Sequence, residues 1–341
     1  MTSRLVFRLI AVAASLTLSG VGWAAGNPRP AAGGYLLVAN KGDHTLSVVD
    51  VTQGKQIRVL QENGVTGHEV AASPDGSRAF VPIYGDSGVG RPGSDGRLLR
   101  IFDLNSGKIV GTIDFGQGIR PHCAVFGPRD GLLYVTTELQ STVSVIDPVS
   151  LKVVGAVPTG KRESHMLAIS SDGLRGYTAN VGSGTVSVLD LVGRKLVTTI
   201  QVAPVVQRIS LSIDGKWAFT ADQTKLRLAV IDTATNEVAR SVALPGLAFG
   251  TAVTPDGRWL LAAIPANSVV AVIDLGLMKV VQTIPVPKAP QEILVSRDGS
   301  SAFVSCDQAH QVAMIDLGKR EVSKLIDVGA VCDGLAWAHV N

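Results

Sequence analysis

Three of the six histidines in this 341-residue chain occupy the same position of an internal repeat. His68, His122 and His165 each open a short apolar run that ends in a turn, and Asp333 opens the last such run. We call this first residue of each run its anchor. Neutral imidazole binds zinc, copper and iron well, and a carboxylate can complete or orient such a ligand set. These four anchors therefore predict a divalent metal site, with zinc or copper as the ion.

The remaining anchors are residues of a different chemistry. From His165 onward the anchors recur every 42 residues, at Gln207, Phe249, Gln291 and Asp333. Glutamine and phenylalanine can hydrogen-bond and pack against an organic ligand, so we expect these three anchors to form a ligand-binding wall opposite the histidines.

A second repeated element shows which strands position the anchors. Seven phrases of about 16 residues end in aspartate, for example LLYVTTELQSTVSVID and RGYTANVGSGTVSVLD. Alternating β-branched residues between Asp-Gly and Ser-rich turns are typical of strands. With the anchored run, each unit reads as four strands, which is the content of a propeller blade. The sequence predicts an all-β, seven-bladed propeller of four-stranded antiparallel blades over residues 26–341.

The ends of the chain predict how the ring closes. The first unit starts with its second strand near Tyr35, whereas the last residues, Asp333 to Ala338, supply only an inner strand. We expect the N- and C-terminal segments to complete one blade together.

In a propeller the inner strands line the central channel, so the seven anchors should ring its mouth on one face, here called the top. Three protein ligands with an open fourth position are typical of catalytic zinc sites. Two other interpretations stay open at this point: histidines that hydrogen-bond channel water, and recognition of an anionic organic ligand.

Blade two carries a ten-residue insertion between its second and third strands, within IYGDSGVGRPGSDGR. That loop should lie on the anchor face. It could cover the channel mouth, with Tyr84, Asp86 and Arg91 facing a ligand, or it could be a surface excursion without a role.

The phrases TVSVID and LLYVTTELQSTVSVID and the SPDG-type turns resemble the YVTN β-propeller repeat of YncE-like proteins. The likeness covers nearly all of Tyr35 to Ala338. It implies a seven-bladed extracytoplasmic propeller. Relatives with this repeat include surface-layer and adhesion proteins, lactonase-like enzymes and propellers that hold copper or haem, so the resemblance does not select a function.

Residues 1–25 predict a secretory signal peptide. Arg4 and Arg8 precede an apolar stretch from Leu9 to Leu18, followed by small residues near Ala24, and the stretch is too short for a membrane span. Without these two arginines the formal net charge of +3 becomes +1. We therefore expect a periplasmic or secreted monomer with no membrane span, and near-neutral charge argues against nucleic acid as a partner.

Cys306 and Cys332 fall near the top of neighbouring blades, so an oxidising compartment would allow a disulfide between them. The third cysteine, Cys123, follows His122 and is either a soft ligand or a buried inert thiol.

These observations predict an exported propeller that binds a metal ion or small ligand, or both, at the top of its channel without catalysing a reaction. Two alternatives remain: a metal-assisted lactonase or esterase-like hydrolase, and a scaffold for a periplasmic protein.

Overall fold

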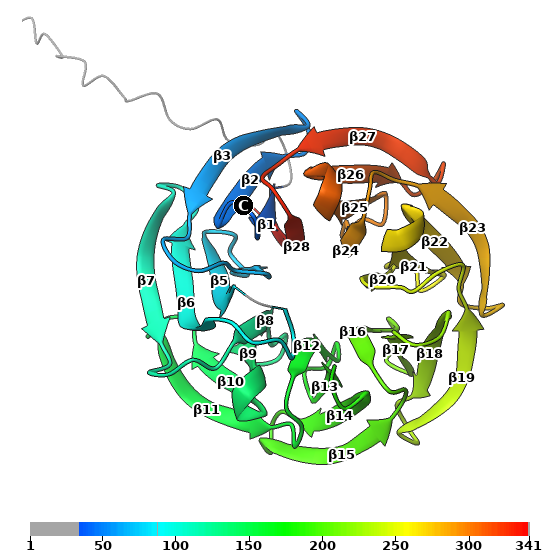
Figure 1. Ribbon diagram of the computed structural model, residues 1–341, viewed down its shortest axis with the longest axis horizontal. Coiled ribbons are helices and arrows are strands. Elements are labelled where there is room, and N and C mark those ends of the chain that lie inside the picture. Colours follow the sequence, from blue (N-terminus) through cyan, green and yellow to red (C-terminus); the bar gives the residue numbers. More distant parts are fainter. Residues whose placement is uncertain (1–33, 87, 340–341) are drawn as a thin grey trace, which may run out of the picture.

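The computed structural model describes residues 34–86 and 88–339, in which seven four-stranded antiparallel sheets form a ring (Figure 1). This confirms the predicted all-β, seven-bladed propeller. The predicted signal peptide, residues 1–25, lies outside the described residues. No helix among the described residues is long and apolar enough to cross a bilayer.

Each blade is given from its inner to its outer strand. Blade one contains β28 (Cys332–Ala338), β1 (Tyr35–Asn40), β2 (Thr45–Asp50) and β3 (Lys55–Gln61). Blade two contains β4 (Ala71–Ala72), β5 (Arg78–Gly85), β6 (Asp95–Asp103) and β7 (Lys108–Asp114). Blade three contains β8 (Pro121–Phe126), β9 (Leu133–Thr137), β10 (Thr142–Asp147) and β11 (Lys152–Pro158). Blade four contains β12 (Ser164–Ile169), β13 (Arg175–Asn180), β14 (Thr185–Asp190) and β15 (Lys195–Gln201).

Blade five contains β16 (Val206–Leu211), β17 (Trp217–Asp222), β18 (Arg227–Asp232) and β19 (Glu237–Ala243). Blade six contains β20 (Thr251–Val253), β21 (Trp259–Ile264), β22 (Val269–Asp274) and β23 (Lys279–Pro285). Blade seven contains β24 (Pro290–Val295), β25 (Ser301–Cys306), β26 (Gln311–Asp316) and β27 (Glu321–Asp327). Short 3₁₀ helices follow the second strand in three blades: η1 (Glu138–Gln140), η2 (Pro265–Asn267) and η3 (Asp307–Ala309).

The aspartate that ends each repeated phrase has a structural cause. In every blade this carboxylate accepts a hydrogen bond from a backbone N–H two or three residues further on, in the turn to the outer strand. The seven residues are Asp50, Asp103, Asp147, Asp190, Asp232, Asp274 and Asp316. Such a side chain mimics a backbone turn. The repeated aspartate is therefore explained by the turn that it stabilises.

The ring closes in blade one, as predicted. β28 pairs antiparallel with β1, with Tyr35 opposite Ala338 and Leu37 opposite Ala336 (Figure 1). All six residues of β1 are buried, and this closure leaves no open inner edge.

Bulges occur at the top of several inner strands. The pairing of β8 with β9 shifts between Pro121 and Ala124, and equivalent shifts occur in β12, β16, β24 and β28. A bulge interrupts the alternation of side chains and re-aims them. In β16 the anchor Gln207 and the next residue, Arg208, both line the cavity at the channel mouth, whereas in β8 and β12 the residue after the anchor, Cys123 or Met166, packs in the core.

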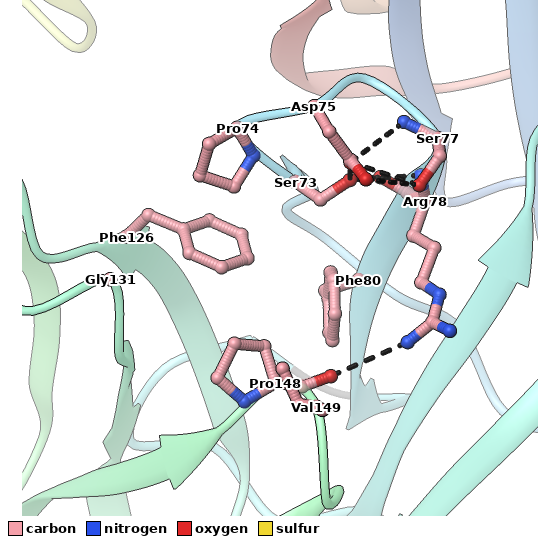
Figure 2. Close-up of a pocket in the computed structure, with 10 residues that line it drawn as sticks. All are labelled: Ser73, Pro74, Asp75, Ser77, Arg78, Phe80, Phe126, Gly131, Pro148 and Val149. Carbon is pink, nitrogen blue, oxygen red and sulfur yellow. Dashed lines mark hydrogen bonds between the residues drawn. The ribbon is translucent and has the colours of Figure 1, made fainter.

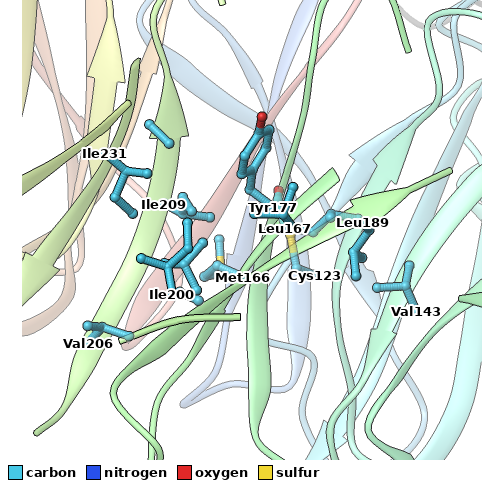
Figure 3. Close-up of a cluster of buried hydrophobic side chains, with 14 of the residues drawn as sticks. Cys123, Val143, Met166, Leu167, Tyr177, Leu189, Ile200, Val206, Ile209 and Ile231 are labelled. Carbon is cyan, nitrogen blue, oxygen red and sulfur yellow. The ribbon is translucent and has the colours of Figure 1, made fainter. Parts of the chain in front are cut away.

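The blades pack through aliphatic side chains, and Figure 3 shows one such cluster around Met166, Leu167 and Ile209. Cys123 belongs to this cluster and is 5% exposed. Burial raises the pKa of its thiol to about 12. This favours the inert, packing interpretation of Cys123 over the ligand interpretation.

Candidate functional site at the channel mouth

The seven anchors surround one cavity of about 150 Å³ at the top of the channel. Its lining comprises the anchors His68, His122, His165, Gln207, Phe249, Gln291 and Asp333, together with Lys41, Gly88, Val89 and Arg208. The ring deduced from the repeat is therefore the ring that the fold builds.

The three histidines lie against one another on successive blades. The ring centroids of His122 and His165 are 3.6 Å apart with planes tilted by 31°, and those of His68 and His122 are 5.5 Å apart and nearly perpendicular. Tyr84 from β5 packs on His68 with a centroid distance of 4.5 Å. The imidazoles thus form a contiguous aromatic wall.

Burial keeps two of these imidazoles neutral. It lowers the pKa of His68 to about 3, with the Lys41 cation adding to the effect. Burial and the neighbouring His165 and His68 also lower the pKa of His122 well below its usual value. At neutral pH both rings therefore offer electron pairs instead of positive charge.

Two buried polar atoms of the wall have no hydrogen-bond partner among the described residues. They are Nδ1 of His122 and Oε1 of Gln207, and both residues line the cavity. Buried polar atoms are nearly always paired with protein or water. These two atoms are therefore candidates to bind a group that enters the cavity.

Glu138 holds His165 from behind. Its side chain is fully buried, and its Oε2 accepts a hydrogen bond of 2.8 Å from the Tyr84 hydroxyl. The other oxygen, Oε1, is in a short hydrogen bond with Nδ1 of His165. Burial and the adjacent Glu138 charge raise the pKa of Tyr84, so its hydroxyl stays protonated and can donate.

Beside the histidines, Arg208 spans the channel from β16. Its guanidinium donates to Glu69 of blade two at 2.8 Å, to Asp333 of blade one at 2.7 Å, and to Glu292 of blade seven. The backbone of Arg208 is left-handed, with φ of 54°, at the bulge of its strand. This buried cation therefore connects blade five with three blades across the ring.

Asp333, predicted as a metal ligand, is bound by cations. Besides Arg208, it accepts the Lys41 ammonium at 2.9 Å. Burial opposes the charge of Asp333, but Lys41 and Arg208 hold its pKa well below the usual range. Its carboxylate is thus already paired with two cations in this structure.

The insertion of blade two reaches the cavity, but through other residues than predicted. Gly88 and Val89 line it, whereas Asp86 and Arg91 do not. The carboxylate of Asp86 instead accepts the Ser94 N–H within the loop at 2.6 Å. Tyr84 lies beneath the loop, fully buried against the histidines.

Arg120 fastens this loop over the mouth. The buried guanidinium donates to the Gly88 and Arg91 carbonyl oxygens at 3.4 and 2.7 Å and pairs with Asp95. It also lies over the Tyr84 ring, 5.6 Å from the centroid. Gly88 and Val89 therefore form part of the rim of the site.

Among the described residues, no group of three or more His, Cys, Asp or Glu side chains is arranged to hold a metal ion. The reason lies in the rings of His122 and His165, which face each other instead of pointing to a common centre. A shared ion would require rotation of at least one of these rings, so metal binding stays a prediction.

Cys306 and Cys332 are buried free thiols in this structure, as is Cys123. The Cys332 thiol donates to the Gln311 carbonyl oxygen at 3.5 Å. Burial raises the pKa of both thiols to about 12, which makes the reactive thiolate scarce. The predicted disulfide is not formed here, and its formation on export stays a prediction.

Larger hollows lie between blades on the opposite face. One of about 340 Å³ lies between blades two and three, lined by Pro74, Phe80, Phe126 and Pro148 (Figure 2). Two similar hollows are lined by tryptophans: Trp217 lines one between blades five and six, and Trp259 lines one between blades six and seven. Their recurrence at equivalent turns shows that blade geometry alone makes them, so the channel mouth is the better candidate.

The comparison with protein families agrees with this architecture. Residues 227–340 match the YNCE-like beta-propeller family. This match confirms the resemblance inferred from the repeats. A search of curated proteins finds no relative of this chain.

Several solved structures share the fold at low sequence identity. Hydrazine synthase of Kuenenia stuttgartiensis superposes with a TM-score of 0.72 at 19% identity, covering 86% of this chain and 99% of its own. Dihydro-heme d1 dehydrogenase NirN superposes with a TM-score of 0.67 at 14% identity, covering 91% of this chain and 76% of its own. A functionally unknown protein from Desulfotomaculum acetoxidans DSM 771 gives 0.73 at 15%, covering 90% and 100%. At these identities the likeness concerns the fold alone.

Sequence reasoning missed Glu138, Lys41 and the Arg208 cluster. A signal for the cluster existed, because Glu69, Arg208 and Glu292 each directly follow an anchor. Opposite charges at the same position of different blades would have indicated a second ring in the channel. Lys41, Glu138 and Asp307 likewise share one repeat position, directly after the second strand, but the sequence does not show which partner each of them meets.

Proposed function

We propose that this protein is a non-enzymatic binding protein whose ligand occupies the channel mouth. The observation that supports this most strongly is the pair of unpartnered buried atoms, Nδ1 of His122 and Oε1 of Gln207, on the wall of one cavity. A buried polar atom without a partner costs about 1–3 kcal/mol. A ligand that satisfies both atoms would recover this cost on binding.

The chemistry of the wall favours a ligand that accepts electron pairs. His68 and His122 are neutral, while Arg208 and Lys41 are already matched by buried carboxylates. An anion would find no unmatched cation among these residues. The ligand is therefore a zinc or copper ion, or a small molecule that presents N–H or O–H groups to the imidazoles, with Phe249 and Gln291 as the opposite wall.

Metal titration tests the first form of the ligand. Metal-free protein is titrated with zinc or copper by isothermal calorimetry, and the bound metal is quantified by elemental analysis. Wild type should bind one ion, and His68→Ala, His122→Ala and His165→Ala should each weaken it. His44→Asn is the control, because His44 is exposed and lies outside the cavity. Equal binding by the control and the three alanine variants would contradict a histidine-bound ion.

Native mass spectrometry tests the second form. Protein purified from the exporting host should carry a small molecule that is lost in His122→Ala and in Gln207→Ala. Absence of both metal uptake and a bound molecule in wild type would overturn the proposed function.

The hydrolase alternative uses the same histidines, with an ion activating water. If the zinc-loaded protein hydrolyses members of a lactone panel and His122→Ala does not, the protein is an enzyme and the proposed non-enzymatic function is wrong. Recovery of one defined periplasmic protein by wild type and all three histidine variants alike would instead favour the scaffold alternative.

We also propose export to the periplasm or medium, on the basis of the leader-like sequence of residues 1–25. The intact mass of the protein recovered outside the cytoplasm should correspond to a chain whose first residue is near Ala25 or Gly26. Retention of the full chain in the cytoplasm would contradict export.

A further inference from the structure

Glu138 is a buried carboxyl group with both oxygens engaged by ring side chains. It begins η1, directly after β9, and is 0% exposed. Tyr84 donates its only hydroxyl proton to Oε2. Removing a carboxylate from water is costly unless hydrogen bonds compensate, and here the second bond comes from His165.

The position of Glu138 in the repeat does not itself require an acid. The corresponding first residue of η2 is Pro265, and that of η3 is Asp307. Asp307 lies 4.0 Å from the Lys41 ammonium. The 3₁₀ turn therefore forms with proline as well as with an acid, and the contact of Glu138 with a histidine is particular to blade three.

The bond to His165 decides which ring nitrogen is free. Tyr84 donates to Oε2 of Glu138, so a carboxylate there can accept a second hydrogen bond through Oε1, and Nδ1–H of His165 would be its donor. The other nitrogen, Nε2, then carries a lone pair. His165 lines the cavity, and within the described part of the chain its Nε2 atom makes no hydrogen bond.

We propose that Glu138 is a positioning residue of the channel-mouth site: it fixes the proton of His165 on Nδ1 and presents the Nε2 lone pair to the ligand. Its effect on the ligand rests on the proposed function, whereas its effect on the ring does not. Carboxylate–histidine pairs of this kind orient the ring and raise its basicity toward a bound metal. The pair thus restricts the ligand to a group that accepts electrons from Nε2.

The tautomer of His165 tests the proposal without any ligand. Protein labelled with ¹⁵N-histidine is examined by long-range ¹⁵N–¹H correlation NMR in the metal-free state. Wild type should show a protonated Nδ1 and an unprotonated Nε2 at His165. Glu138→Gln should move the proton toward Nε2, because the glutamine amide can donate to Nδ1. Tyr84→Phe should leave the tautomer unchanged, since it removes only the bond to the other carboxylate oxygen.

Zinc affinity, measured by calorimetry, tests the consequence for binding. Glu138→Gln should bind zinc about 10–100-fold more weakly than wild type. Asp307→Asn is the matched control, because it removes an acid at the same repeat position that lies near Lys41 and His310 and contacts none of the three cavity histidines. It should retain wild-type affinity.

The two readouts separate the proposals. A protonated Nε2 in wild type, or an unchanged tautomer in Glu138→Gln, would overturn the role of Glu138 even if zinc binds. If wild type takes up no zinc while the tautomer responds as expected, the metal form of the proposed function falls and the positioning role stands. The wild-type measurement needs no variant, so it decides the case even if Glu138→Gln fails to fold.

Discussion

Replacing Arg208 with methionine should lower the free energy of unfolding by about 3–5 kcal/mol, the cost of breaking a buried ion pair by removing one partner. Methionine retains much of the side-chain volume but leaves Glu69, Glu292 and Asp333 without their shared cation. Urea unfolding followed by circular dichroism at pH 7.5 would measure the change. Arg297→Met is the control, because Arg297 is exposed and should change stability by no more than about 0.5 kcal/mol.

The stability of Arg208→Met relative to wild type should also depend on pH. Burial and nearby carboxylates raise the pKa values of Glu69 and Glu292 even with Arg208 present, and the Arg208 charge opposes this rise. Removing Arg208 should therefore raise both pKa values further, so the folded variant binds protons more tightly than folded wild type. Its stability should then rise relative to wild type as the pH falls from about 7.5 to 5. The depressed pKa of Asp333 does not contribute to this difference, because the stability that it supplies is lost only below about pH 4, where the unfolded chain becomes protonated.

A second variant tests the cause. Adding Glu69→Gln and Glu292→Gln to Arg208→Met removes most of the uncompensated charge, so it should recover much of the lost stability. An Arg208→Met protein as stable as wild type at pH 7.5 would refute the reasoning. So would a loss that is the same at every pH and is not reduced by the two glutamines.

A chain that ends at Val331 lacks β28, the inner strand of blade one, and should lose cooperative thermal unfolding by circular dichroism; a wild-type melting temperature would show that closure is dispensable. Protein exported into an oxidising compartment should show one titratable thiol after denaturation, that of Cys123, if Cys306 and Cys332 pair, whereas three thiols would exclude the disulfide. NMR titration should find His68 unprotonated down to about pH 5, because burial lowers its pKa to about 3, and a midpoint near 6.5 would indicate a hydrated ring.

The repeat made the fold and the anchor ring predictable. The spacing of His165, Gln207 and Phe249 along the chain is the spacing of blades, and a ring of equivalent positions follows from closure. The aspartate-ended phrases could be assigned to turns for the same reason, since each carboxylate acts within its own blade.

The contacts inside the ring were not predictable in this way. Glu138 meets His165 across a blade boundary, and Arg208 meets carboxylates from three distant blades. The repeat gives the position of such residues within a blade, but it does not show which side chains of different blades meet inside the ring. Asp333 is an example: it lies in the anchor ring as predicted, but the sequence did not indicate that Lys41 and Arg208 would be its partners.

The span of Arg208 across the channel has a consequence for exchange. Its guanidinium binds carboxylates from blades one, two and seven, so we expect this buried cluster to restrict passage along the channel beside the histidines. A molecule bound at the mouth would then leave through the face by which it entered, past Gly88 and Val89. Ligand binding and ligand release would then use the same opening, and a protein docked on that face would affect both.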